Sequence, residues 1–127
     1  MTMAEGMVRA DALAVRDGRL ALAVRLPWYR SLPLSCLESV EVALDGHPVP
    51  VRSVAVPGFA GSIEQAASCD TTWDLRDPLD VTLDGAARPG DVVALDVHLA
   101  VRIPYIQQAP GVPLVQRTAV RTEATIR

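Results

Sequence analysis

Hydrophobic and polar residues alternate along much of this chain, which is the pattern of a β-strand with one buried face. The clearest run covers residues 93–103, where every second residue is apolar and the residues between are polar or small. The apolar positions are Val93, Leu95, Val97, Leu99, Val101 and Ile103. A helix could not place them on one face, because its side chains repeat every 3.6 residues. The run therefore predicts a half-buried antiparallel strand.

Shorter runs of the same kind cover residues 20–26, 40–44 and 79–83. Turn signals separate them at regular intervals, because Asp-Gly pairs favour the positive φ angles of a tight hairpin. These signals are Asp17-Gly18, Asp45-Gly46, Asp84-Gly85 and the further turn pair Pro89-Gly90. We predict an all-β fold, an antiparallel β-sandwich or partly open barrel of about eight short strands. Residues 1–127 suffice for one such domain.

Two further features refine this fold. Pro48 and Pro50 predict an edge strand, because proline cannot donate a hydrogen bond to a neighbouring strand. No long segment has helical periodicity, so helix is limited to a turn or two near Ser62 to Ala67. The chain has only five aromatic residues, and the core must be built from Val, Leu and Ala. We expect Trp73 to anchor that core.

Composition and charge exclude several classes of function. The net charge is −3, the twelve basic residues are all arginines, and they form no basic run. Nucleic-acid binding is therefore not expected, because it needs a clustered cationic patch. No apolar stretch approaches the roughly 18 residues of a membrane span, and the N-terminus lacks the pattern of a signal peptide. We expect a cytoplasmic protein with no membrane partner.

A catalytic or metal-binding centre is not evident in the sequence. Cys36 and Cys69 have neither zinc-ligand nor redox spacing, and we expect two buried thiols, although their pairing state is open. Asp96 and His98 share the polar face of one strand, but a zinc site needs three or four protein ligands. A self-contained lyase using these two residues with Arg102 is the weakest alternative. We predict no catalytic residue and no metal ligand in this chain.

Two stretches echo one another: residues 22–28, Leu-Ala-Val-Arg-Leu-Pro-Trp, and residues 99–105, Leu-Ala-Val-Arg-Ile-Pro-Tyr. In each, an alternating strand ends in Arg, an apolar residue, Pro and an aromatic ring. Because proline stops the ladder and fixes the backbone, we expect Trp28, Tyr29 and Tyr105 at strand exits. Such rings would either form a docking arm for a partner or plug an open end of the sandwich.

The docking interpretation assigns partner binding to one segment and two residues outside it. Trp, Tyr and Arg contribute interface energy disproportionately, because they bury large areas and still form hydrogen bonds. The predicted partner-binding residues are Trp28, Tyr29, Arg30, Ser31, Leu32, Pro33, Arg102 and Tyr105.

Residues 25–35, Arg-Leu-Pro-Trp-Tyr-Arg-Ser-Leu-Pro-Leu-Ser, followed by the strand and Asp-Gly turn at 40–46, resemble the small β subunit of bacterial C-glycoside deglycosidases. Trp73 and the Arg-Ile-Pro-Tyr strand at 102–105 match the order of the family pattern. The resemblance spans residues 20–106. Trp28 and Ser31 stand where the family pattern has Tyr and Gly, and a serine would tolerate poorly some conformations open to glycine. A related group with another substrate is thus left open.

The resemblance implies a heteromer with a divided task. The large α subunit of the family is a (β/α)8 barrel that holds a divalent metal, such as manganese, and the acid/base residues. It removes the C2 proton of a 3-oxo-C-glycoside and cleaves the bond between the sugar and the aglycone carbon by elimination. This chain would be its non-catalytic partner, with no cofactor of its own and with the glycoside held mainly by the α subunit.

The alternative function is a stand-alone carbohydrate- or ligand-binding β-sandwich, in which Trp28, Tyr29 and Tyr105 stack on a sugar ring. The sequence leaves open the aglycone and sugar specificity, the stoichiometry of the heteromer, and whether a residue of this chain reaches the partner's active site. Tyr29 and Arg30 are the candidates for such a reach.

Overall fold

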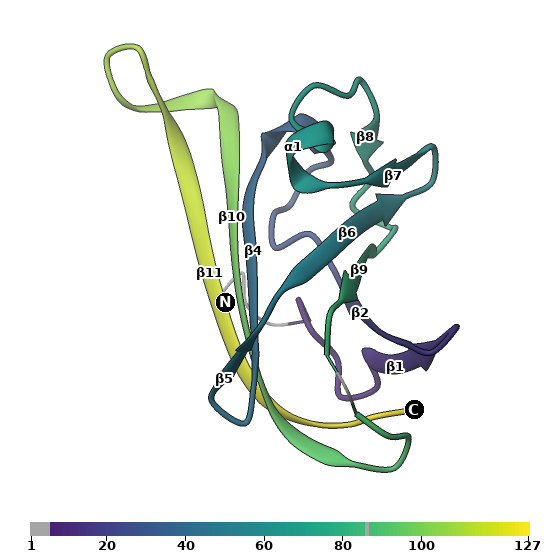
Figure 1. Cartoon of the computed structure of the whole chain (residues 1–127). Coiled ribbons are helices and arrows are strands. Elements are labelled where there is room, and N and C mark those ends of the chain that lie inside the picture. The colour runs from purple at the N-terminus through teal and green to yellow at the C-terminus, as the bar shows by residue number, and fades with distance from the viewer. Residues whose placement is uncertain (1–5, 86) are drawn as a thin grey trace.

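Two antiparallel sheets face each other in the computed structural model, which describes residues 6–85 and 87–127 (Figure 1). The first sheet has the strand order β1-β2-β9-β6-β7 and the second has the order β11-β10-β4-β5. The sheets do not close into a barrel. The prediction of an all-β sandwich is therefore confirmed.

The strands of the first sheet are β1 (Leu13–Arg16), β2 (Arg19–Val24), β6 (Val51–Val56), β7 (Phe59–Gly61) and β9 (Leu79–Leu83). Those of the second are β4 (Leu37–Leu44), β5 (His47–Val49), β10 (Val92–Ala109) and β11 (Val112–Thr125). A two-stranded sheet of β3 (Leu32–Pro33) and β8 (Thr72–Trp73) completes the set, together with a 3-10 turn, η1 (Leu34–Cys36), and one short helix, α1 (Ile63–Ala66).

The expectation of about eight short strands is too low in number, and two of the strands are longer than expected. The described residues contain eleven strands, and β10 and β11 are 18 and 14 residues long. The alternating run at 93–103 is the first part of β10, which continues to Ala109. Strand β11, at the edge of its sheet, shows no clear hydrophobic alternation because its more buried side carries small or polar residues such as Thr118, Thr122 and Ala124.

Two of the predicted hairpin turns are confirmed. Asp17 and Gly18 join β1 to β2, and Asp45 and Gly46 join β4 to β5, with φ between 51° and 81° at all four residues. Both turn residues thus have the positive φ that a type I′ turn requires. The turn at Pro89-Gly90 is also confirmed, since Gly90 has a φ of 96°.

The predicted hairpin at Asp84-Gly85 is wrong. Gly85 does not adopt a positive φ, and the chain leaves β9 for β10 in the opposite sheet. Both sides of β9 are already paired, with β2 and with β6. No position remains beside β9 for a hairpin partner, so the Asp-Gly pair serves a crossing between sheets.

The edge-strand and helix predictions are confirmed. Pro48 lies in β5 at the edge of the second sheet, and Pro50 follows directly after it. Helix α1 has one turn and is capped by Ser62, whose hydroxyl accepts a hydrogen bond from the Gln65 backbone amide. The Gln65 side chain accepts one from the Ser62 amide in return, which completes a capping box. No helix among the described residues is long and apolar enough to cross a membrane.

The core lies between the two sheets and consists almost entirely of Val and Leu. The alternate residues of β10 from Val93 to Ile103 are all buried there, as the two-residue period predicts. Trp73 is only 1% exposed, and its indole N–H donates to the Asp77 carbonyl oxygen at 3.0 Å. The expectation that Trp73 anchors the core is confirmed. The main buried side chains of the first sheet are Leu20, Leu22, Val24, Val54, Leu79, Val81 and Leu83.

The C-terminal residues join the two sheets at one side. After β11 ends, Ile126 is buried and Arg127 lies beside β1. The Val15 amide donates to the Arg127 carbonyl oxygen at 2.9 Å, and the Arg127 amide donates to the Leu13 carbonyl oxygen at 3.1 Å. The end of the second sheet thus continues as a partner of the first sheet's outermost strand.

Candidate docking surface

The two Arg-x-Pro-aromatic stretches of the sequence meet in space. The indole N–H of Trp28 donates to the Tyr105 hydroxyl oxygen at 2.6 Å, although the residues are 77 positions apart. The segment with Trp28 follows β2 of the first sheet, and Tyr105 belongs to β10 of the second. The echo in the sequence therefore corresponds to two stretches, one from each sheet, that meet at a single site.

The expected strand exit is confirmed for the first stretch and wrong for the second. Strand β2 ends at Val24, so Trp28 and Tyr29 follow its exit. Pro104 does not end β10. The pairing of β10 with β11 shifts between Ile103 and Gln107, which leaves residues 104–106 as a bulge within the long strand. A bulge tolerates a proline that lacks an N–H, and it redirects the side chains that it contains.

Trp28, Tyr29, Arg30 and Tyr105 form a compact group, here called the aromatic cluster. The ring centroids of Trp28 and Tyr29 lie 5.0 Å apart, with the ring planes tilted by 40°. The Arg30 guanidinium carbon lies 5.1 Å from the centroid of the Tyr105 ring, within the range of a cation–π interaction. Tyr29 and Tyr105 are 58% and 47% exposed. Large rings are thus held in place by one another and face solvent.

Each phenol of the cluster changes the acidity of the other. The neighbouring Tyr105 hydroxyl raises the pKa of Tyr29, and partial desolvation raises it further. Partial desolvation also acts to raise the pKa of Tyr105, but the Trp28 N–H, the Tyr29 hydroxyl and the Arg30 charge outweigh it, and the pKa of Tyr105 is lowered. Tyr105 is therefore the acceptor at the centre of the cluster.

The plug and docking interpretations apply to different members of the cluster. Trp28 is half-buried and packs against the hydrophobic core. It closes part of the sandwich, as a plug would. Tyr29, Arg30 and Tyr105 lie outside the core and are exposed. Their exposure is what a contact surface requires.

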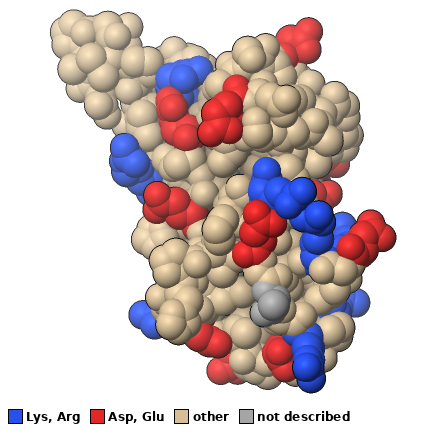
Figure 2. Space-filling view, viewed as in Figure 1, with Lys and Arg blue, Asp and Glu red and all other residues tan. Residues whose placement is uncertain are grey.

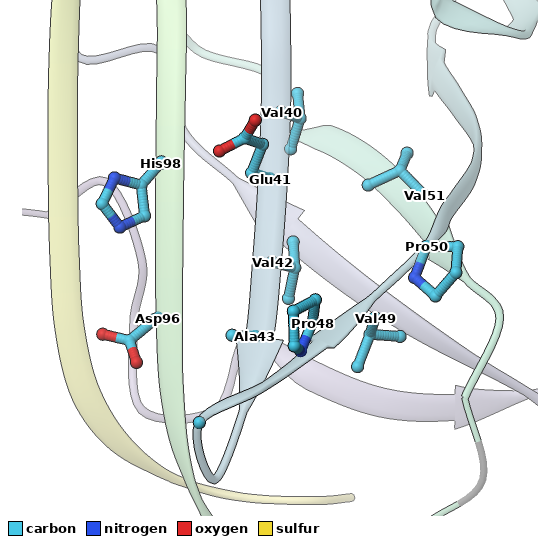
Figure 3. A pocket seen from close by; sticks show the side chains of 11 residues that line it. Val40, Glu41, Val42, Ala43, Pro48, Val49, Pro50, Val51, Asp96 and His98 are labelled. Carbon is cyan, nitrogen blue, oxygen red and sulfur yellow. The ribbon is translucent and has the colours of Figure 1, made fainter.

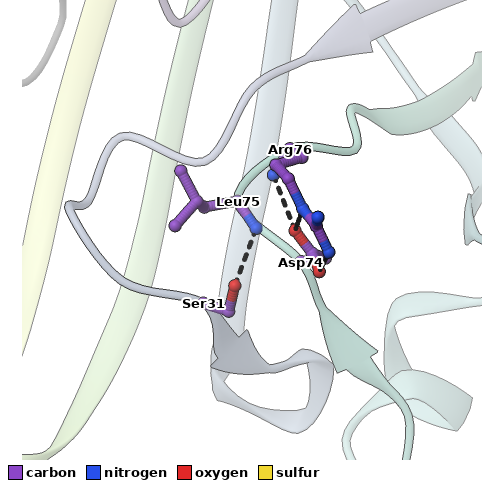
Figure 4. A network of polar contacts seen from close by, with 4 residues as sticks. All are labelled: Ser31, Asp74, Leu75 and Arg76. Carbon is purple, nitrogen blue, oxygen red and sulfur yellow. Dashed lines mark hydrogen bonds and ion pairs between the residues drawn. The ribbon is translucent and has the colours of Figure 1, made fainter.

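A turn at residues 74–76 holds the neighbouring part of the segment in place (Figure 4). The Ser31 hydroxyl accepts a hydrogen bond from the Leu75 amide at 2.9 Å. Asp74 accepts from the Arg76 amide at 2.8 Å, and the two side chains form an ion pair at 2.9 Å. Ser31 does not have a positive φ. Serine therefore replaces the family's glycine here without backbone strain, because this position does not need the positive φ that favours glycine. Its hydroxyl anchors the segment.

We predict that this turn makes stability depend on pH in the acid range. The side-chain and backbone hydrogen bonds from Arg76 lower the pKa of Asp74 from 3.8 to about 2. Because the folded pKa lies below the unfolded one, this contribution is complete above the ordinary pKa and is lost as the pH falls toward 2. In urea titrations at pH 5 and pH 2.5, wild type should lose more stability than Asp74→Asn. Arg76→Ala should flatten the profile similarly. Parallel profiles for wild type and Asp74→Asn would refute the assignment.

Leu32 and Pro33, the last predicted contact residues of the segment, differ in exposure. Leu32 is 2% exposed and pairs with Trp73 in the small β3–β8 sheet. Pro33 is exposed. The side chain of Leu32 therefore belongs to the core and offers no contact surface. Its burial holds the end of the segment that carries the aromatic cluster.

Arg102 is engaged within the chain, apart from the cluster. Its guanidinium donates to the Glu38 carboxylate at 3.0 Å and to the Ser35 carbonyl oxygen at 3.3 Å. It also lies 4.0 Å from the Cys36 sulfur. Burial raises the pKa of the Cys36 thiol, and Arg102 offsets this only in part. Arg102 thus ties β10 to the start of β4.

The two cysteines differ in environment. Both Cys36 and Cys69 are free thiols, but only Cys36 is fully buried, while Cys69 is half-buried. The prediction of two buried thiols is therefore confirmed for Cys36 alone.

The two charged groups of the weakest catalytic alternative each form an ion pair with another residue. Asp96 forms an ion pair with Arg121 at 3.6 Å, and Arg102 pairs with Glu38. His98 is exposed on the outer face of β10. Across residues 6–85 and 87–127, no group of three or more His, Cys, Asp or Glu side chains is placed to hold a metal ion. Asp96 and Arg102 are thus engaged in separate ion pairs, and Asp96 and His98 line one groove that does not include Arg102.

Sequence reasoning missed an apolar groove of about 670 Å³ beside β4 and β5 (Figure 3). Valines and prolines from β4 to β6 line most of it, and Glu41, Asp96 and His98 lie at its rim. It arises because β5 pairs only with residues 42–44 of β4, which leaves the rest of that strand edge open. No alternation or motif signals a groove of this kind, which depends on how two strands diverge.

Comparison with known proteins identifies the family. Residues 16–105 match the sequence pattern of the C-glycoside deglycosidase beta subunit family. The chain is 33% identical to the 3'-dehydrocarminate deglycosidase beta subunit of a Microbacterium species, covering 87% of this chain and 85% of that protein. It is also 33% and 30% identical to two C-glycoside deglycosidase beta subunits of Arthrobacter globiformis. Those alignments cover 84% and 94% of this chain, and 85% and 95% of the relatives. The chain belongs to the C-glycoside deglycosidase beta subunit family.

Proposed function

We propose that this chain is the small, non-catalytic subunit of a heteromeric C-glycoside deglycosidase. Its partner would be a metal-dependent (β/α)8 α subunit that cleaves the C–C glycosidic bond of 3-oxo-C-glycosides. The observation that carries the proposal is the family match across residues 16–105. The exposed aromatic cluster supports it, because a subunit needs a rigid surface on which to assemble.

The reaction assigned to the complex is an elimination. The ketone at C3 acidifies the C2 proton, and a base of the α subunit removes that proton. A double bond forms between C1 and C2 while the bond from C1 to the aglycone carbon breaks. The electron pair leaves with the aglycone carbon, which then takes up a proton.

The proposal places the base and the divalent metal on the α subunit. The metal would supply a Lewis acid for the developing negative charge on the C3 oxygen. The described residues of this chain do not fit such an ion, because no three ligating side chains converge. What this chain supplies is the contact formed by Tyr29, Arg30 and Tyr105, with Trp28 as the support behind them.

Co-expression tests the proposal directly. The chain would be produced together with a candidate α subunit, a sugar-isomerase-like (β/α)8 barrel, and the mixture applied to gel filtration at micromolar concentration. We expect one co-eluting complex that cleaves a 3-oxo-C-glycoside, whereas each subunit alone is inactive. Separate elution of two folded proteins would contradict the proposal.

The stand-alone sugar-binding function is decided by calorimetry of the isolated chain with C-glucosides. The structure favours it less, because the Arg30 guanidinium already lies over the Tyr105 ring and the Trp28 and Tyr29 rings are tilted rather than coplanar. Saturable binding by the isolated chain would support this function instead.

A further inference from the structure

The tip of the β10–β11 hairpin projects beyond the rest of the sandwich (Figure 1). Residues 103–116 contain no charged side chain, although charged residues make up 21% of the chain. In the space-filling view the projecting lobe shows neither acidic nor basic atoms (Figure 2). We call residues 104–116 the hairpin arm. Most of it lies beyond the residues that match the family pattern, which end at Tyr105.

The hairpin arm is built to be stiff. Prolines 104, 110 and 113 restrict its backbone, and Gly111 turns the chain with a φ of 75°. A second shift in pairing, between Gln107 and Ala109, bends the tip again. A preformed arm loses little conformational freedom when it binds, so its contacts contribute more fully to affinity.

The exposed surface of the arm is apolar and amide-like. Residues 107–112 are all exposed, and Val112 is 44% exposed. Further along β11, exposed Arg117, Arg121 and Glu123 place charges on the same edge strand. Charged side chains on an edge strand discourage pairing with other proteins. The arm lacks this protection, as expected for a part of the edge that is covered in the assembled protein.

We infer that the hairpin arm inserts into an uncharged, apolar cleft of the α subunit. This inference rests on the proposed function. Tyr105 belongs both to the arm and to the aromatic cluster, so the arm continues the cluster without a break. A cleft lined by charged side chains would have to bury those charges without a partner, because the arm carries no opposite charge.

A second copy of this chain fits the arm less well. An apolar recess that a second copy offers is the groove by Val42, Val49 and His98, which lies outside the arm. An arm seated there would make a head-to-tail contact, which propagates into open assemblies unless the rotation closes. The α subunit is therefore the partner that fits the arm better.

Two exposed valines at opposite ends of the same sheet provide the test. Val112 lies at the arm and Val92 at the start of β10, where it is 57% exposed. We expect Val112→Glu to weaken binding of the purified cognate α subunit at least about tenfold by calorimetry. Val92→Glu, the matched control, should stay within about twofold of wild type. Amides of residues 107–116 should also gain protection from hydrogen exchange in the wild-type complex.

The outcomes separate this inference from the proposed function. If wild type does not bind the α subunit, both fail. If wild type binds and Val112→Glu binds equally well, with no protection of the arm, only the arm inference fails. Sedimentation of the isolated chain covers the remaining occupant: self-association that Val112→Glu abolishes, with α-subunit binding unchanged, would assign the arm to a second copy. Thermal unfolding of both variants confirms that each remains folded.

Discussion

Replacing Tyr29 by Ala should weaken the complex with the α subunit by more than about tenfold, which is the loss expected for an aromatic residue at the centre of an interface. Tyr29 is the most exposed aromatic side chain among the described residues, and its ring is already oriented by Trp28 at 5.0 Å. Little freedom would be lost on binding, so the substitution removes contact area and preorganisation together. Titration calorimetry of the purified subunits measures the effect.

His98→Ala is the matched control for this experiment. His98 is exposed like Tyr29, but it lies on the outer face of β10 and is not part of the aromatic cluster. We expect its loss to change affinity and turnover by less than about twofold, as at most surface positions. An equal or larger loss from His98→Ala would move the contact to the outer face of β10. Arg30→Ala should resemble Tyr29→Ala.

Replacing Trp73 by Ala should destabilise the chain by about 3–5 kcal/mol, the usual range for a buried tryptophan. Trp73 is 1% exposed, packs beside Leu32 through the β3–β8 pairing, and donates to the Asp77 carbonyl oxygen. The substitution leaves a cavity and an unpaired carbonyl at once. It should therefore lower the urea midpoint strongly and release the segment that carries the aromatic cluster.

Leu75→Ala is the control that shows whether the loss in Trp73→Ala comes from the burial of the indole or from its position in this loop. Leu75 lies two residues away from Trp73, is 42% exposed, and contributes only its backbone amide to the bond with Ser31. We expect a change of within about 0.5 kcal/mol. If Trp73→Ala were as mild as Leu75→Ala, the indole would not be the anchor of this end of the core.

The parts of the fold that follow a local rule were predictable. The stripe of β10, the edge position of Pro48 and the capped turn at Ser62 each depend on a few neighbouring residues. The Asp84-Gly85 hairpin failed because a local turn signal cannot show that both neighbours of β9 are already in place. Strand β11 was missed because its more buried side carries Thr118, Thr122 and Ala124, so that burial alternates along the strand while hydrophobicity does not.

The residues of the candidate site were easier to predict from the sequence than their arrangement in space. The repeated Arg-x-Pro-aromatic pattern indicated Trp28, Tyr29 and Tyr105. In the structure a hydrogen bond that no local rule supplies joins Trp28 to Tyr105, and the Tyr29 ring lies beside Trp28. The bulge at Pro104 could not be foreseen, since it depends on how many residues β11 offers opposite β10. Leu32 lies among predicted contact residues in the sequence, but its side chain is buried in the core.

The central position of β9 has a consequence for how this protein folds. Strand β2 has no permanent neighbour on its inner side until residues 79–83 arrive, and β6 waits for the same strand. Pairing strands that are distant in sequence is slow, because the chain loses the entropy of loop closure before the contacts between the strands stabilise it. During that interval the unpaired edges of β2 and β6 can pair with other chains. Slower synthesis and a lower temperature should therefore raise the yield of native protein more than an increase in the stability of the folded state does.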